Sequence, residues 1–134
     1  MILGLGLDIV DLTMMAEKCF GNPLGGFREN NFTEGEIRYA EEHYPKNPIE
    51  SLSVRWAAKE AFLKALDMVN LGHERLIKQV NNREIEIVSD DQSRPTILLH
   101  GQVKSVAAQL KVSRISLSLS HDGNYAAAVV ILEN

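Results

Sequence analysis

The sequence of 134 residues lacks several features that would define its class at once. It has one cysteine, Cys19, so the chain can form no internal disulfide and no zinc site built from several thiolates. No apolar run approaches the ~20 residues that span a bilayer, and the start, MILGLGLD, lacks the basic segment and cleavage site of a secretory signal. We therefore expect a cytoplasmic protein without membrane association.

Basic residues are not in excess either. The chain has 14 Lys and Arg against 18 Asp and Glu, a net charge of -4, whereas a nucleic-acid binder needs a clustered basic face. We find no repeat, low-complexity tract or linker, and 45% of the residues are hydrophobic. These features predict one globular domain over residues 1–134 that does not bind nucleic acid.

The first third of the chain predicts a strand followed by helices. Residues 2–10 alternate as a strand, with leucines and Ile9 on one side and Gly4, Gly6 and Asp8 on the other. A helix is expected over residues 11–20. Thr33 and Glu36 form a capping box, which predicts a helix that begins at Glu34 and ends before Pro45.

A long central helix and a set of short strands follow. Asn47 and Pro48 are typical of a helix start, and this helix should run to about Leu71, with Gly72 as its end. Strands are expected over 84–88 and 96–100, then a short helix, and finally a hairpin of strands 114–120 and 125–132 with Asp122-Gly123 as a type I′ turn. This order predicts an α+β fold, a mostly antiparallel sheet packed around the long central helix.

The central helix contains the segment RWAAKEAFLKAL at 55–66, which places charges among apolar residues. At about 100° per residue, Glu60, Lys64 and Asp67 share a narrow stripe, while the alanines on another arc are small enough for a sheet to lie very close. One interpretation is a solvent-facing i,i+4 pair of Glu60 and Lys64, which contributes roughly 0.2–0.5 kcal/mol. The other is a charged strip at the bottom of a cleft.

The strand GLGLD offers a possible partner for that strip. Its two glycines let another element approach the backbone closely, and Asp8 follows on the same face. Asp8 could cap the next helix. If it instead meets Glu60 across the core, two carboxylates repel, and a hard cation such as Mg²⁺ resolves the conflict while giving Lys64 a phosphate to hold.

The last hairpin carries Ser116, Ser118 and Ser120 on one face, small enough to admit a neighbouring backbone or a ligand. His121 follows, and two interpretations are open: a residue that hydrogen-bonds locally in the turn, or a functional group. Ser120, His121 and Asp122 cannot form a catalytic triad, because adjacent residues in a tight turn cannot make the required relay.

Taken together, these motifs resemble one family in order, spacing and chain length. The segments GLGLDIV, FTEGE, RWAAKEAFLKAL, EIEIVSDDQSRPTILLHG and SLSHDGNYAAAVV are similar to those of the holo-acyl-carrier-protein synthases, the small 4′-phosphopantetheinyl transferases. The resemblance implies a single phosphopantetheinyl transferase domain that moves 4′-phosphopantetheine from coenzyme A to a serine of an acyl carrier protein in fatty acid biosynthesis. Adenosine 3′,5′-bisphosphate is released. It also implies a homotrimer with active sites between protomers.

The resemblance further implies a role for each candidate residue. Asp8 and Glu60 match the family's Mg²⁺ ligands, and Lys64 matches the lysine at the diphosphate. We assign Arg55, Ser120 and His121 to the nucleotide and its phosphates, across a subunit boundary. Glu60, acting directly or through a metal-bound water, is the candidate general base.

Two departures from the family pattern affect the expected carrier and the pocket. Met14 stands where family members commonly have an arginine on the helix that docks the acidic carrier, and Asp67-Met68-Val69-Asn70 replaces a glycine-rich turn. We expect slower transfer or a different carrier, with an intact metal site. The alternatives are a metal-dependent hydrolase of coenzyme A or of a nucleotide diphosphate, and a coenzyme A binding module without transfer activity.

Overall fold

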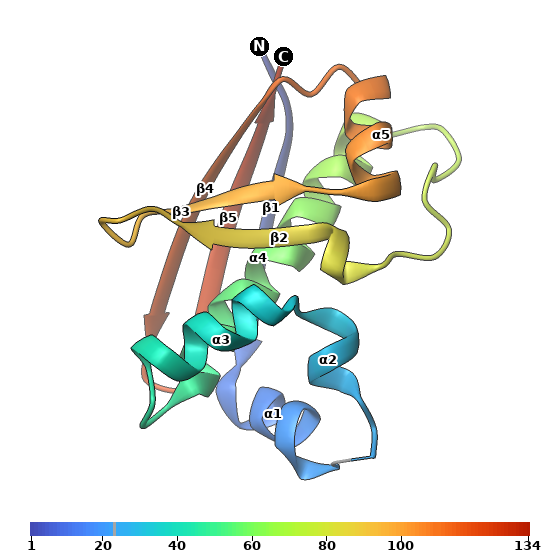
Figure 1. Cartoon of the computed structure of the whole chain (residues 1–134). Helices are drawn as coiled ribbons and strands as arrows, with labels where there is room; N and C mark the ends of the chain where they lie inside the picture. Colours follow the sequence, from blue (N-terminus) through green and yellow to red (C-terminus); the bar gives the residue numbers. More distant parts are fainter. Residues whose placement is uncertain (23) are drawn as a thin grey trace.

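Two antiparallel sheets and one long helix make up most of the chain. A computed structural model describes residues 1–22 and 24–134. The larger sheet has the order β1-β5-β4 and packs on the long helix; the smaller sheet pairs β2 with β3 (Figure 1). The bounds are β1 (Ile2–Asp11), α4 (Pro48–Val69), β2 (Ile85–Ser89), β3 (Pro95–Leu99), β4 (Arg114–Asp122) and β5 (Tyr125–Glu133). The predicted α+β class, a mostly antiparallel sheet around a long central helix, is confirmed.

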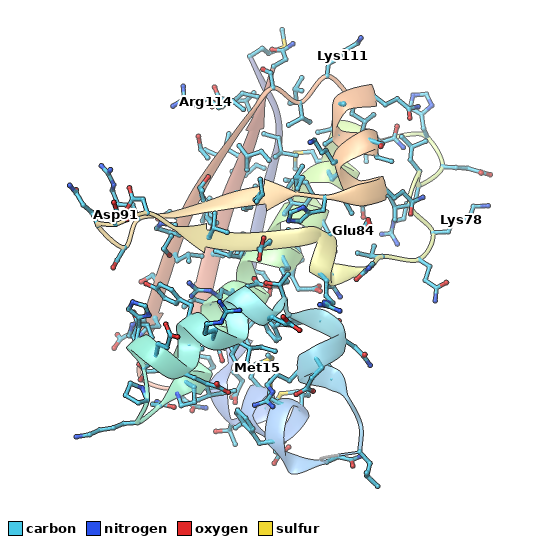
Figure 2. All side chains as sticks on the ribbon, viewed as in Figure 1. Met15, Lys78, Glu84, Asp91, Lys111 and Arg114 are labelled. Carbon is cyan, nitrogen blue, oxygen red and sulfur yellow. The ribbon has the colours of Figure 1, made fainter. Side chains whose placement is uncertain are left out.

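The shorter helices gather at the two ends of this frame. At one end lie α1 (Leu12–Ala16), the π-helical η1 (Glu17–Gly21), α2 (Phe27–Asn31) and α3 (Glu34–His43); at the other lies α5 (Gly101–Gln109), while the 3₁₀ turn η2 (Asn82–Glu84) precedes β2 (Figure 1). Met15 of α1 is buried, and the β2–β3 turn with Asp91 at its tip projects from the body (Figure 2). Within residues 1–22 and 24–134, no helix is both long and apolar enough to cross a bilayer.

Side-chain caps mark the starts of α1 and α3, whereas α4 begins at Pro48 and the side chain of Asn47 makes no capping bond. The capping box is confirmed: the Thr33 hydroxyl accepts a bond of 3.1 Å from the Glu36 N–H, and the Glu36 carboxylate accepts one of 2.9 Å from the Thr33 N–H. Asp11 caps α1 by accepting from the Met14 N–H at 3.1 Å. The interpretation of Asp8 as the cap of this helix is therefore wrong.

Other boundaries differ from the predictions. The expected helix over 11–20 is a short α-helix that continues as a π-helix, α4 ends at Val69 rather than Leu71, and β2 and β3 each shift by one residue. Asp122 pairs with Tyr125, so the turn of the hairpin consists of Gly123 and Asn124. Only Gly123 has positive φ, the pattern of a type II′ rather than a type I′ turn. Asn124 is tied to α1, because its carbonyl accepts from the Leu12 N–H at 2.9 Å.

A buried ion pair joins α3 and β2 to α4. The Lys59 ammonium, 0% exposed, donates to a Glu36 oxygen at 2.8 Å and to the carbonyls of Asn82 and Ile85 at 2.9 and 2.5 Å. The other Glu36 oxygen accepts from the Ile87 N–H at 3.1 Å. Burial lowers the pKa of Lys59, and the charge of Glu36 opposes that shift. The pair thus satisfies backbone groups of η2 and β2 as well as its own charges.

We predict that Lys59→Met lowers the free energy of unfolding by about 3–5 kcal/mol, because it leaves the Glu36 carboxylate buried without its cation. Chemical denaturation measures the change. Lys104→Met, on the exposed side of α5, is the control and should have almost no effect. Adding Glu36→Gln to Lys59→Met should recover part of the loss. Equal midpoints for the two lysine variants would contradict this account.

Candidate active site

The site begins where β1 crosses α4 at very short range. A Cβ atom on Gly6 would overlap the Ala61 carbonyl, and one on Gly4 would overlap the Ala65 carbonyl. Both alanines are fully buried. Only glycine on the strand and a small residue on the helix permit this approach. Since Gly4 faces Ala65 and Gly6 faces Ala61, the strand and the helix run in opposite directions, and Asp8 comes level with the turn of α4 that carries Glu60.

The structure brings Asp8, Glu60 and Lys64 together. The Lys64 ammonium donates to an Asp8 carboxylate oxygen at 2.9 Å and to the Leu7 carbonyl at 3.0 Å. Among the described residues, Lys64 forms its ion pair with Asp8 and not with Glu60. The interpretation of Glu60 and Lys64 as a simple solvent-facing i,i+4 pair is therefore wrong.

Glu60 is half-buried and its carboxylate has no direct cationic partner among residues 1–22 and 24–134. Burial raises the pKa of Glu60, and the negative charge of Asp8 raises it further, while Lys64 and Lys18 lower it. The carboxylates of Asp8 on β1 and Glu60 on α4 repel each other, and they supply oxygen ligands of the kind that Mg²⁺ takes. The donor set therefore fits a hard divalent cation.

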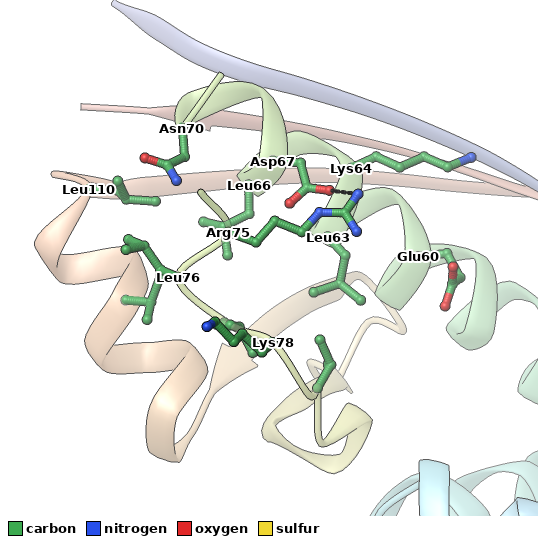
Figure 3. Close-up of a pocket in the computed structure, with 13 residues that line it drawn as sticks. Glu60, Leu63, Lys64, Leu66, Asp67, Asn70, Arg75, Leu76, Lys78 and Leu110 are labelled. Carbon is green, nitrogen blue, oxygen red and sulfur yellow. Dashed lines mark ion pairs between the residues drawn. The ribbon is translucent and has the colours of Figure 1, made fainter. Parts of the chain in front are cut away.

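A cavity of about 370 Å³ extends from these residues along the second half of α4 (Figure 3). Glu60 and Lys64 stand at one end of it, and Lys64 points toward β1. Leucine, isoleucine and valine side chains line most of the interior: Leu63, Leu66, Leu76, Ile77, Val80, Val106 and Leu110. Arg75 pairs with Asp67 at 2.9 Å across the wall. The cavity offers an apolar space beside a charged rim, and Asp67 and Asn70 of the unusual DMVN segment lie in its lining.

A second cavity, of about 330 Å³, contains the other three predicted residues: Arg55, Ser120 and His121. Arg55 is only 4% exposed, donates to the Ser51 hydroxyl at 2.8 Å and lies over the Tyr39 ring at 4.4 Å. Its Nε atom is buried and has no hydrogen-bond partner in the described part of the chain. Burial lowers the pKa of Arg55 while Glu36 opposes the shift, but a guanidinium stays protonated in proteins. A buried cation with an unused donor is suited to an anionic ligand.

The six predicted residues thus fall into two groups within the chain. Asp8, Glu60 and Lys64 share one location, whereas Arg55, Ser120 and His121 line a separate cavity with no residue in common with the first. Sequence reasoning missed Tyr39, Tyr44 and Ser89, which also line the second cavity. Tyr39 and Tyr44 lie in and directly after α3, and only the folded chain brings them to Arg55.

Comparison with known proteins gives a consistent result. Residues 4–130 match the family model described as ACPS, 4′-phosphopantetheinyl transferase superfamily. A holo-[acyl-carrier-protein] synthase of Nocardia farcinica is 40% identical over 99% of this chain and 88% of its own length. Its counterpart in Geobacter sulfurreducens is 38% identical over 99% of this chain and 98% of its own length.

Solved structures agree with the sequence comparisons. The structure described as the Chronobacterium ammoniagenes ACPS-CoA complex has a TM-score of 0.88 at 34% identity and covers 96% of this chain and 95% of that one. The Helicobacter pylori holo-[acyl-carrier-protein] synthase in complex with coenzyme A has a TM-score of 0.75 at 25% identity, with coverage of 96% and 99%. The chain therefore belongs to the holo-acyl-carrier-protein synthase family within the 4′-phosphopantetheinyl transferase superfamily.

Proposed function

We propose that the chain transfers 4′-phosphopantetheine from coenzyme A to a serine hydroxyl of an acyl carrier protein and releases adenosine 3′,5′-bisphosphate. The observation that carries this proposal is the convergence of Asp8, Glu60 and Lys64 beside an apolar cavity. The relatives named above act on acyl carrier protein, and two of the solved structures contain coenzyme A. Both observations favour the same substrates here.

The reaction needs charge neutralisation and alignment more than covalent chemistry. The serine oxygen attacks the phosphorus attached to pantetheine, the bond from that phosphorus to the bridging oxygen breaks, and the electron pair leaves with the nucleotide phosphate. Asp8 and Glu60 would hold Mg²⁺, which supplies neutralisation of the diphosphate charge. Lys64 holds the diphosphate oxygens, and the apolar cavity takes the pantetheine arm. Glu60, whose pKa is raised by burial and by the charge of Asp8, accepts the serine proton.

We further propose that the protein works as a homotrimer with active sites between protomers. One face of the large sheet packs on α4, but the other exposes Leu5, Leu7 and Ile9 of β1 by 48%, 59% and 67%. Opposite them on β5 stand Ile131, Val129 and Ala127. A contiguous apolar face of this kind favours self-association. In such an assembly, Arg55, Ser120 and His121 of one protomer complete the site that Asp8, Glu60 and Lys64 begin on its neighbour.

The surface next to the site favours a carrier that does not depend on strong charge steering. Lys18 of η1 lies near enough for its charge to act on Glu60, and α1 directly precedes η1. Met14 is 57% exposed, and Arg28 is already paired with Glu29 at 2.7 Å. Few cations on this surface are therefore free to attract an acidic carrier.

We expect intact-mass analysis to detect addition of phosphopantetheine to an apo acyl carrier protein incubated with this protein, coenzyme A and Mg²⁺. Glu60→Gln should slow transfer by about 10²–10⁴-fold. The same variant should raise the melting temperature of the metal-free protein at pH 7 by about 2 °C, a value discounted for solvent screening.

The melting temperature should rise in Glu60→Gln because the pKa of Glu60 is raised in the folded protein. A carboxyl with a raised folded-state pKa favours the folded state below its unfolded pKa of about 4.3, and this contribution is lost as pH rises through the folded value. The rise in melting temperature caused by Glu60→Gln should therefore disappear at acidic pH. Phosphopantetheine released without a carrier would instead support a hydrolase, and binding of coenzyme A without turnover would support a binding module.

Assembly through the open sheet face is tested by Leu7→Lys, which should yield monomers in light scattering and lose transfer while keeping its circular dichroism. Leu98→Lys, at a similarly exposed leucine on β3, is the control and should remain assembled. Co-expression of Glu60→Gln with Arg55→Ala should restore about a quarter of the activity per site. With random mixing of the two variants, about one interface in four combines an intact Glu60 with an intact Arg55 from the neighbouring protomer. An active Leu7→Lys monomer would refute shared sites.

Met14→Arg should lower the KM for an acidic carrier by about two- to fivefold at low salt, because it adds an unpaired cation beside the site. The KM for coenzyme A should not change. Raising the salt concentration should erase the difference between variant and parent. A carrier KM unaffected by Met14→Arg at every salt concentration would remove α1 from the docking surface.

A further inference from the structure

Lys64 contacts one of the two carboxylates of the candidate cation site and the backbone carbonyl beside it. Its ammonium lies 2.9 Å from an Asp8 carboxylate oxygen and 3.0 Å from the Leu7 carbonyl. The Asp8 side chain is only 15% exposed, and Lys64 is the cation bonded to its carboxylate. A divalent cation bound to that oxygen and an ammonium at hydrogen-bond distance from it would repel each other strongly.

The lysine is the partner that is able to move. Its side chain is 55% exposed and ends in a flexible four-carbon stem, whereas Asp8 is fixed on a strand that is held against α4 by the two glycines. Lys64 also lines the cavity that extends away from β1, so the ammonium has a second direction in which to reach. In the described part of the chain, Asp8 is the carboxylate that forms an ion pair with Lys64.

We propose that Lys64 is an internal cation that neutralises Asp8 in the metal-free protein and competes with Mg²⁺ for it, then exchanges to the diphosphate when metal and coenzyme A bind. The second half rests on the function proposed above; the competition for Asp8 does not. Lys64 is a positioning residue in the first state and a substrate-binding residue in the second.

The exchange has a consequence for the order of binding. Mg²⁺ alone must displace Lys64 from Asp8 without giving the ammonium a new partner, whereas Mg²⁺ with coenzyme A offers it phosphate oxygens. Coenzyme A should therefore strengthen Mg²⁺ binding, and Mg²⁺ should strengthen coenzyme A binding by the same factor. Removal of the ammonium should weaken this coupling.

The test is titration of the whole protein with MgCl₂ at constant ionic strength, without coenzyme A, followed by calorimetry and by the shift in melting temperature. Lys64→Met should bind Mg²⁺ about fivefold more tightly than the parent, the equivalent of losing one exposed ion pair that opposes the metal. Its metal-dependent rise in melting temperature should be larger to match. In the presence of the metal, its affinity for coenzyme A should fall.

Lys18→Met is the matched control, because Lys18 acts on Glu60 through its charge but makes no contact with Asp8. It should tighten Mg²⁺ binding by less than about twofold. Lys64→Gln, which keeps a polar group, guards against a folding defect in Lys64→Met and should also bind Mg²⁺ more tightly than the parent. Unchanged or weaker Mg²⁺ binding in both Lys64 variants would overturn the proposal, as would equal tightening in Lys18→Met. Carrier modification decides the proposed function separately, since this titration needs no carrier.

Discussion

The close approach of β1 to α4 is the constraint on which the rest of the structure depends. At Gly4 and Gly6 there is no room for a side chain between the strand and the Ala65 and Ala61 carbonyls. The distance between β1 and α4 and their register are therefore both fixed. That register carries Asp8 to the level of Glu60. This arrangement places two carboxylates close together in a partly buried position, and burial and the charge of Asp8 together raise the pKa of Glu60. The packing requirement and the chemistry of the site therefore have one cause.

Charged residues on α4 fall into two groups with different surroundings. Lys59 is structural: its ammonium is fully enclosed, and its partners are Glu36 and two backbone carbonyls. Glu60 and Lys64 lie on a neighbouring side of the same helix, remain partly exposed and border a cavity. A buried pair fixes the position of α4 relative to α3 and β2, and this rigid placement holds the partly exposed groups where a ligand can reach them.

Sequence reasoning recovered what depends on local rules and missed what depends on contacts between distant segments. The capping box at Thr33, the alternation of β1 and the alanine arc of α4 are short-range patterns, and the structure contains all three. The partner of Lys59 lies 23 residues away, and no periodicity could identify it. The type II′ turn and the π-helical end of α1 escaped because small differences in tertiary contacts decide between neighbouring backbone conformations. The separation of Arg55 from Glu60 follows from helix geometry: five residues of α4 turn one side chain by about 140° from the other.

The two faces of β1 differ in what they contact. One face presents glycine and Asp8 to α4, while the other presents Leu5, Leu7 and Ile9 away from it. Because side chains alternate along a strand, a slip of one residue would push leucine into α4 and turn Asp8 outward. Pairing with β5, in which Leu7 stands opposite Val129 and Asp8 opposite Ala128, opposes such a slip. An interface formed on the outer face would hold the same register from the other side. The proposed interface and the packing against α4 would thus act on opposite faces of one strand, and each would oppose a shift of Asp8 away from its position.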